Sequence, residues 1–105
     1  MCTLAAAYNI GEIIYHRNFN YRGVIVDVDP NFQGTDEWYE KNAVSHPAKD
    51  IPWYHVLVDD EDLVTYVAQS NLELSLLPEP LEHPMLESLF SGYDEGKYNL
   101  RMRLN

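Results

Sequence analysis

Histidine and acidic side chains are the residues of this 105-residue chain whose chemistry could support a metal site or acid–base catalysis. The four histidines lie in different segments, without the short spacing of ligands that share one zinc ion: His16, His46, His55 and His83. His16 and His55 could still meet across paired strands, and we interpret them as structural histidines. Fold analogy alone suggests a small-molecule pocket, in which these two would be the only polar groups.

Two clusters of carboxylates stand out, Asp27 with Asp29 and the acidic run at residues 59–62. An EF-hand loop needs a glycine and a distal glutamate at set positions, and neither cluster has them. Weak surface binding of calcium is the alternative that remains open. We therefore predict no metal centre and no bound cofactor.

Nucleophilic catalysis is not indicated by the sequence. Cys2 is the single cysteine, has no base near it in the sequence and cannot form an internal disulfide, so we interpret it as part of a frayed terminus. No serine or cysteine lies in a nucleophile elbow, and the glycines are too scattered for a phosphate-binding loop. We predict that the protein is not an enzyme.

The charge distribution limits the kinds of partner. Seventeen acidic and seven basic residues give a net charge of −10, and no lysine or arginine lies between Lys49 and Lys97. A nucleic-acid binder usually presents a basic face, which here would require gathering the C-terminal tail or Arg17, Arg22, Lys41 and Lys49. The acid surplus indicates a well-solvated surface, with an acidic docking surface as the alternative.

Length and composition indicate one domain with a real hydrophobic core. Hydrophobic residues make up 46% of the chain, and no apolar run approaches the 18 or so residues of a membrane span. The first eight residues lack the basic region of a signal peptide. The single cysteine fits a reducing compartment. We expect a cytoplasmic protein that has no membrane partner.

The spacing of apolar residues predicts several short strands. Residues 52–59 are aromatic or β-branched almost throughout, with side chains that alternate between two faces, and an acidic turn at 59–62 joins them to a return strand at 63–68. The other strands are expected at residues 12–16, 22–30 and 72–74, with an edge strand in 98–105. In the 22–30 strand we expect Val24, Val26 and Val28 on one face, and Gly23 could permit a bulge or a close backbone approach.

Two helical segments are expected outside these strands. Thr35 would cap one or two turns that carry Trp38 and Tyr39, and these aromatics either pack back on the sheet or stay exposed for a partner. Residues 83–90 predict a short helix with Pro84 in its first turn. The apolar stripe of this second helix would cover the core or a neighbouring subunit.

The pattern predicts a mainly all-β fold: a small SH3-like β-barrel with a short helical insert and a C-terminal helix or tail. Residues 1–8 form a flexible lead-in, residues 9–76 the barrel domain with a loop insertion at 31–51, and residues 77–105 an extension on the barrel or a neighbouring subunit. The expected structural core is Val24, Val26, Trp53, Tyr54, Val56, Val58 and Tyr66.

Short motifs along the chain also carry a resemblance. They are Ile10-Gly11, His16-Arg17, Tyr21-Arg22-Gly23-Val24-Ile25, Asp27-Val28-Asp29-Pro30, Pro52-Trp53-Tyr54-His55-Val56-Leu57-Val58, Thr65-Tyr66-Val67-Ala68, Asn71-Leu72, Glu82-His83-Pro84 and Arg103-Leu104-Asn105. The chain in this respect resembles the HspQ heat-shock protein family, also called the YccV-like or hemimethylated-DNA-binding domain family. The likeness spans about residues 9–105, and its two central motifs together are quite specific.

The resemblance implies an SH3-like barrel, no catalysis, and self-association, with a trimer as one form. It implies a stress role in which the protein helps a Lon-type ATP-dependent protease degrade particular or denatured client proteins. The alternative is binding of hemimethylated DNA, with an effect on replication-initiator levels. The candidate partner-binding residues are Arg17, Phe19, Tyr21, Arg22, Trp38, Tyr39 and Phe90.

Overall fold

The computed structural model describes residues 5–77, 79–94 and 96–101 of the chain. A five-stranded antiparallel sheet has the order β4-β3-β2-β1-β5. Its strands are β1 (Ile13–His16), β2 (Tyr21–Asp29), β3 (Trp53–Val58), β4 (Val64–Ala68) and β5 (Leu72–Leu74). The remaining elements are α1 (Asp36–Asn42), the 3₁₀ turn η1 (Gln69–Asn71), α2 (Leu86–Leu89) and the hairpin of β6 (Phe90–Asp94) and β7 (Lys97–Leu100).

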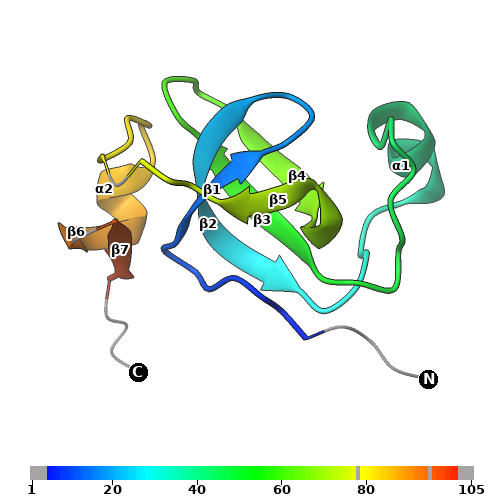
Figure 1. Cartoon of the computed structure of the whole chain (residues 1–105), viewed down its shortest axis with the longest axis horizontal. Coiled ribbons are helices and arrows are strands. Elements are labelled where there is room, and N and C mark those ends of the chain that lie inside the picture. Colours follow the sequence, from blue (N-terminus) through cyan, green and yellow to red (C-terminus); the bar gives the residue numbers. More distant parts are fainter. Residues whose placement is uncertain (1–4, 78, 95, 102–105) are drawn as a thin grey trace.

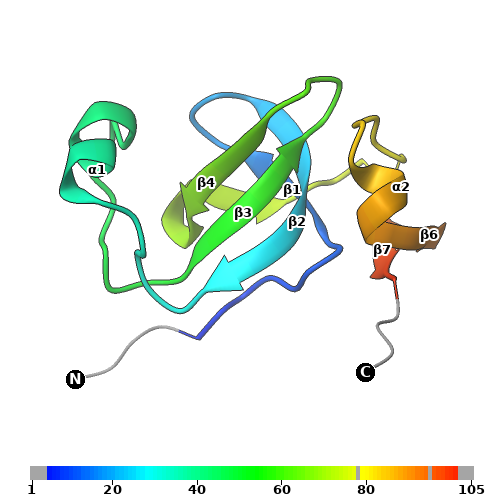
Figure 2. The same ribbon diagram turned by 180° about the vertical axis from the view of Figure 1, so that it is seen from behind.

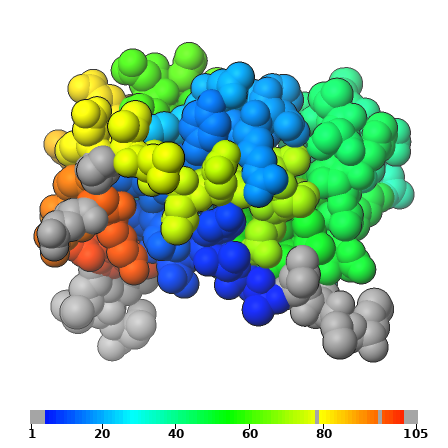
Figure 3. Space-filling model, in the orientation of Figure 1, coloured from blue at the N-terminus to red at the C-terminus, as the bar shows by residue number. Residues whose placement is uncertain are grey.

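This arrangement confirms the predicted all-β class. The large sheet curls, so that β1 and β5 cross in front of β3 and β4 (Figure 1). The helical insertion lies at one end of the sheet and the C-terminal segment at the other, a division that the molecular surface also displays (Figure 3). Among the described residues no ladder joins the outer strands β4 and β5, so the curled sheet is not hydrogen-bonded into a closed ring.

Strand β3 lies near the middle of the sheet and supplies side chains to three hydrophobic clusters. Tyr54 and Val56 point into the interior of the curl, where they pack with Ile14 and other apolar residues. Trp53 and Leu57 point the other way, because successive side chains of a strand alternate between its faces. Trp53 packs with the insertion that carries α1, and Leu57 packs with the C-terminal segment.

A β-bulge interrupts the pairing of β2 with β3. Ile25 pairs with Val56, but the next paired residue is Asp27, opposite His55, so that Val26 is the extra residue. The prediction that Val24, Val26 and Val28 share one face is therefore wrong for Val28, which packs against the cluster of Ile25.

Gly23 provides the close approach that its sequence context suggested. An added Cβ there would overlap a methyl group of Val56 and lie 2.7 Å from the Leu57 carbonyl oxygen, so β2 and β3 could not keep their spacing with any larger residue. The bulge itself falls three residues later, at Val26.

Several local predictions are confirmed. The hairpin of β3 and β4 turns through Asp59 and Asp60, with Asp60 in the left-handed conformation at φ 68°. Thr35 caps α1, since its hydroxyl accepts a hydrogen bond of 3.1 Å from the Trp38 N–H. The turn at Gln69–Asn71 and the short strand Leu72–Leu74 also occur where expected.

The C-terminal segment differs from its prediction. The expected helix over residues 83–90 is reduced to Leu86–Leu89, because Phe90 is extended and begins β6. The expected edge strand is β7, which ends at Leu100 and pairs with β6 in a hairpin that the sequence reasoning missed. Residues 102–105 of that prediction lie outside the described part of the chain, as do residues 1–4 of the predicted lead-in.

The C-terminal hairpin is joined to the large sheet through backbone groups. The Tyr98 N–H donates to the Gly11 carbonyl oxygen at 2.8 Å, and an isolated bridge pairs Glu12 with Lys97. The Tyr98 hydroxyl accepts from the Leu81 N–H at 2.8 Å. Gly11 has φ 95°, and an added Cβ would overlap the Tyr98 carbonyl oxygen, so only glycine fits this contact.

The Gly11→Ala variant should therefore lose about 1–3 kcal/mol of unfolding free energy, from backbone strain and displacement of Tyr98. Urea denaturation measures this loss. The matched control is Gly92→Ala, because an added Cβ at Gly92 meets no atom within 4 Å. Equal urea midpoints for the two variants would contradict the described contact.

Candidate functional site

A cavity of about 640 Å³ lies beside β4, between the large sheet and the insertion that carries α1. All residues of β4 line it, together with the turn between β1 and β2 and the loop that follows α1. No Asp, Glu, Lys or Arg is among its lining residues. A concave, mainly apolar site of this size with a few polar groups is typical of a binding site.

The wall formed by the β1–β2 turn is ordered by His16. Its ring lies 4.7 Å from the Phe19 ring and 5.1 Å from the Tyr21 ring, measured between centroids. The Nδ1 atom accepts hydrogen bonds from the N–H groups of Asn18, at 3.1 Å, and Phe19, at 3.2 Å. An Nδ1 atom that accepts must be unprotonated, and burial lowers the pKa of His16 below its ordinary value of 6.5.

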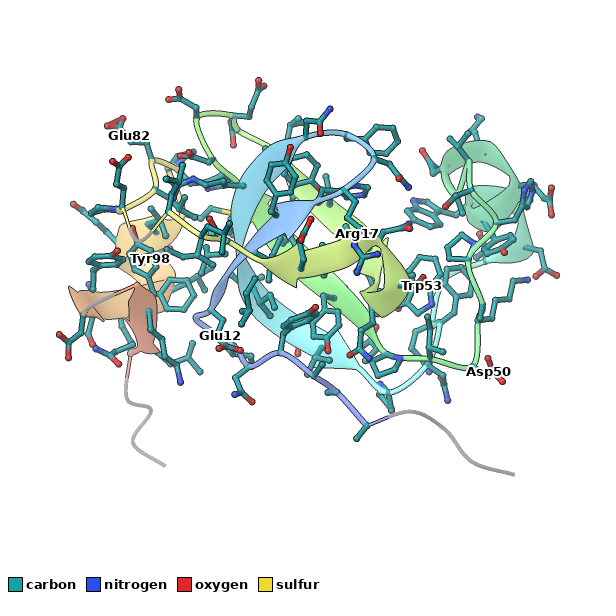
Figure 4. The ribbon with its side chains drawn as sticks, in the orientation of Figure 1. Glu12, Arg17, Asp50, Trp53, Glu82 and Tyr98 are labelled. Carbon is teal, nitrogen blue, oxygen red and sulfur yellow. The ribbon has the colours of Figure 1, made fainter. Side chains whose placement is uncertain are left out.

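Aromatic rings form the opposite wall, where the insertion meets β3 and β4. The half-buried Trp38 ring lies 5.7 Å from Tyr66 and 6.2 Å from Trp53 in T-shaped arrangements. Trp53 is 1% exposed and donates its ring N–H to the Ala48 carbonyl oxygen at 3.0 Å, which holds the insertion against the sheet. In Figure 4 Trp53 lies on the side of the sheet that faces α1.

A polar network adjoins this wall. The Tyr66 hydroxyl donates to Oδ2 of Asp29 at 2.6 Å, and Nε2 of His55 lies 3.2 Å from the same oxygen. Burial and the hydrogen bond to Asp29 raise the pKa of Tyr66 to about 12. Because Tyr66 and His55 both line the cavity, the Asp29 carboxylate contacts two lining residues.

Asp27, Asp29 and His55 form the one group of potential metal ligands found among the described residues. One ligand atom of each lies within 4.8 Å of the others. A divalent cation accepts such oxygen and nitrogen ligands, but here it would compete with the Tyr66 hydroxyl for Asp29. The absence of a functional metal therefore remains a prediction.

The structure places three of the predicted partner-binding residues in the cavity: Phe19, Tyr21 and Trp38. Phe19 is 61% exposed. Arg17, which directly follows β1, is also exposed. Its guanidinium group lies 3.4 Å from the carbonyl oxygen of Leu72, the first residue of β5. A partner-binding role stays a prediction for all of these residues.

The other three predicted residues make internal contacts. Tyr39 is 7% exposed and donates its hydroxyl to the Pro47 carbonyl oxygen at 2.7 Å, while Phe90 is 4% exposed and packs against Tyr98. Arg22 donates to the carbonyl oxygens of Leu77, at 2.9 Å, and Glu79, at 3.1 Å. These three side chains are largely covered, so they are weaker candidates for contact with a partner than Phe19 or Trp38.

The residues predicted as structural core divide in a similar way. Most are buried: Val24, Trp53, Tyr54, Val56 and Val58. Val26 and Tyr66 are half-buried at the edges of clusters. Tyr66 thus contributes both to packing and to the cavity wall.

Sequence reasoning missed two parts of this site. The loop after α1, through Val44 and Pro47, carries no motif that marks it as a cavity wall. His55 and Asp29 become neighbours only through the pairing of β2 with β3 after the bulge. His16 and His55 do line the same cavity, but from β1 and β3, which β2 separates.

The curled sheet and its aromatic cavity define a small all-β domain with the features of a binding module. The chain belongs to the YccV-like family: the family model described as "Hemimethylated DNA-binding protein YccV like" matches residues 6–97. The resemblance inferred from the sequence motifs is thereby confirmed. Among the described residues, no helix is long and apolar enough to cross a membrane.

The lowered pKa of His16 predicts a pH-dependent stability. Below about pH 6.5 the unfolded chain binds a proton at His16 more readily than the folded protein does, so stability is complete above that pH and is lost as the pH falls towards the folded pKa. Urea denaturation of wild type and His16→Gln at several pH values measures the effect. The wild type should lose more stability than the variant between pH 7.5 and pH 5.5, a range that spans about one pH unit on each side of the ordinary histidine pKa.

The control for this comparison is Leu76→Ala, since Leu76 is 95% exposed and carries no ionisable group. It should keep the wild-type dependence on pH. Parallel pH profiles for wild type and His16→Gln would contradict the assigned role of the buried, hydrogen-bond-accepting imidazole.

Proposed function

We propose that this protein is a non-enzymatic, cytoplasmic docking factor in protein turnover. It would help a Lon-type ATP-dependent protease degrade denatured or particular client proteins during heat stress. Membership of the YccV-like family supports this role through the sequence resemblance described above. Self-association, with a trimer as one form, would present several copies of the binding surface and increase avidity.

The observation that carries the proposal is the aromatic cavity on an acidic protein. The exposed Phe19 and half-buried Trp38 rings lie at a concave, uncharged surface, and the chain around it has a net charge of −10. Large aromatic side chains beside adaptable polar groups are enriched at protein-binding surfaces. Such a surface suits apolar segments, which denatured proteins expose.

A degradation assay tests this role. We expect the initial rate at which a purified Lon-type protease degrades a fluorescently labelled denatured client to rise when the protein is added. The Phe19→Ala variant should need a concentration about tenfold higher for the same effect, because it loses an exposed aromatic contact.

The matched control is Leu76→Ala, which removes an exposed apolar side chain outside the cavity. This variant should behave like the wild type. An unchanged degradation rate at saturating protein would refute the proposed role, and equal behaviour of Phe19→Ala and Leu76→Ala would refute the involvement of the cavity.

Binding of hemimethylated DNA is the second candidate, because the description of the matching family model names it. Affinity for DNA comes largely from neutralising phosphates, and the net charge of −10 opposes this. Two of the four cations in the first half of the chain are engaged: Arg22 lies 3.4 Å from Asp59, and Lys49 lies 3.2 Å from Asp36. Arg17 and Lys41 are exposed.

Gel shifts at about 50 mM salt decide between the two functions, because phosphate contacts are strong at low salt. With hemimethylated and fully methylated duplexes of one sequence, we expect no shift at protein concentrations that saturate the degradation assay. A shift confined to the hemimethylated duplex, and weakened in Arg17→Ala, would instead support DNA binding.

A further inference from the structure

Strand β4 has an edge that pairs with none of the described strands. It is the outermost strand of the large sheet and pairs only with β3 among the described strands. In Figure 2 it lies on the side of the sheet that faces α1. An unpaired strand edge presents a row of free N–H and C=O groups that can pair with another chain.

The register shows which backbone groups are free. The Val58 N–H donates to the Leu63 oxygen at 3.1 Å, and the Gln69 N–H donates to the Pro52 oxygen at 2.9 Å. In an antiparallel pair, residues that are hydrogen-bonded to the partner strand alternate with residues that are not. The backbone N–H and C=O groups of Thr65 and Val67, which lie between Leu63 and Gln69 at this spacing, therefore also face β3. The backbone groups of the alternate residues face away from β3: Val64, Tyr66 and Ala68. Ala68 is only 1% exposed, so Val64 and Tyr66 are the accessible positions of this edge.

The cavity runs along this edge. Every residue of β4 lines it. The remaining lining comes from Phe19 and Tyr21 and from the end of α1 with the loop that follows it. Val67 and Ala68 are buried, so the accessible part of β4 is residues 64–66, which span about 10 Å at about 3.3 Å per residue. The cavity therefore offers a backbone template and side-chain pockets to a segment of about three extended residues.

Charge indicates which kind of segment fits. The lining holds no Asp, Glu, Lys or Arg side chain, which suits apolar side chains, and the Asp29 carboxylate contacts the lining residues His55 and Tyr66. A chain with net charge −10 attracts basic segments. The complementary occupant is an extended, apolar segment flanked by basic residues.

We propose that the free edge of β4 binds such a segment of an unfolded polypeptide by adding it as a further strand of the sheet. This inference rests on the proposed function as a docking factor and specifies the part of the client that is recognised. Backbone hydrogen bonds to Val64 and Tyr66 supply affinity that does not depend on the client's sequence. The rings of Phe19, Trp38 and Tyr66 select apolar side chains.

Fluorescence polarisation with a labelled peptide of alternating valine and tyrosine, flanked by lysines, tests the proposal without any protease. Two derivatives carry N-methyl groups on alternate residues, one on each edge of the peptide strand. The derivative methylated on the edge that faces β4 should bind about tenfold more weakly than the other, because its donors are lost. A peptide flanked by glutamates should also bind more weakly.

Protein variants test the same edge. Val64→Pro removes an N–H that faces away from β3, a position where an edge strand tolerates proline, and should weaken binding about tenfold. Val64→Ala keeps the N–H and is the matched control, which should retain most of the affinity. If Val64→Pro does not fold, the comparison of methylated peptides on the wild-type protein still decides.

Three outcomes would overturn the inference: no binding of the parent peptide, equal binding of the two methylated derivatives, or equal binding by Val64→Pro and Val64→Ala. A change of sedimentation in Val64→Pro without peptide binding would assign the edge to self-association instead. If the protein accelerates degradation but these peptide tests fail, only the present inference is lost. If the peptides bind as expected but degradation is unaffected, the turnover role is lost.

Discussion

The structure depends most on the alternation of side chains along β3. Tyr54 and Val56 fill the interior of the curled sheet, while Trp53 and Leu57 on the opposite face anchor the insertion and the C-terminal segment. One strand of six residues thus contributes to every hydrophobic cluster found among the described residues. Burial of large apolar side chains on both faces stabilises the position of β3, and the neighbouring elements pack around it.

The bulge at Val26 places polar groups beside the cavity. Without the extra residue, Asp27 and Asp29 would point to the opposite face of β2, because a shift of one residue exchanges the faces of a strand. With it, Asp29 reaches the Tyr66 hydroxyl and His55 at the margin of the cavity. A local irregularity of the backbone therefore determines where the polar groups of the site lie.

Local features of the fold could be predicted because they are encoded within short segments. The β3–β4 hairpin follows from alternating side chains around an acidic turn, and the cap at Thr35 follows from its hydroxyl and the acidic residues after it. The face assignment of Val28 failed because a bulge depends on the partner strand. The β6–β7 hairpin was missed because the sequence around Gly92 reads as loop, and its pairing is seen only in the fold.

The candidate site could be predicted only in part, for a similar reason. Phe19, Tyr21 and Trp38 were selected as aromatics in loops and helices, and the structure gathers them around one cavity. These residues line the cavity together with β4, and Asp29 lies beside His55. Both arrangements arise from contacts between residues far apart in the sequence. Tyr39 and Phe90 share the same side-chain chemistry but lie inside, which composition alone does not distinguish.

The joint between Gly11 and Tyr98 has a consequence for how such chains diverge. It consists of a main-chain hydrogen bond and a strand-like bridge, and these require a backbone shape more than any particular side chain. Neighbouring positions such as Lys97 and Asn99 are exposed and can drift through many amino acids without loosening the joint. The C-terminal hairpin can therefore change its surface chemistry over evolution while the glycine that receives it stays fixed.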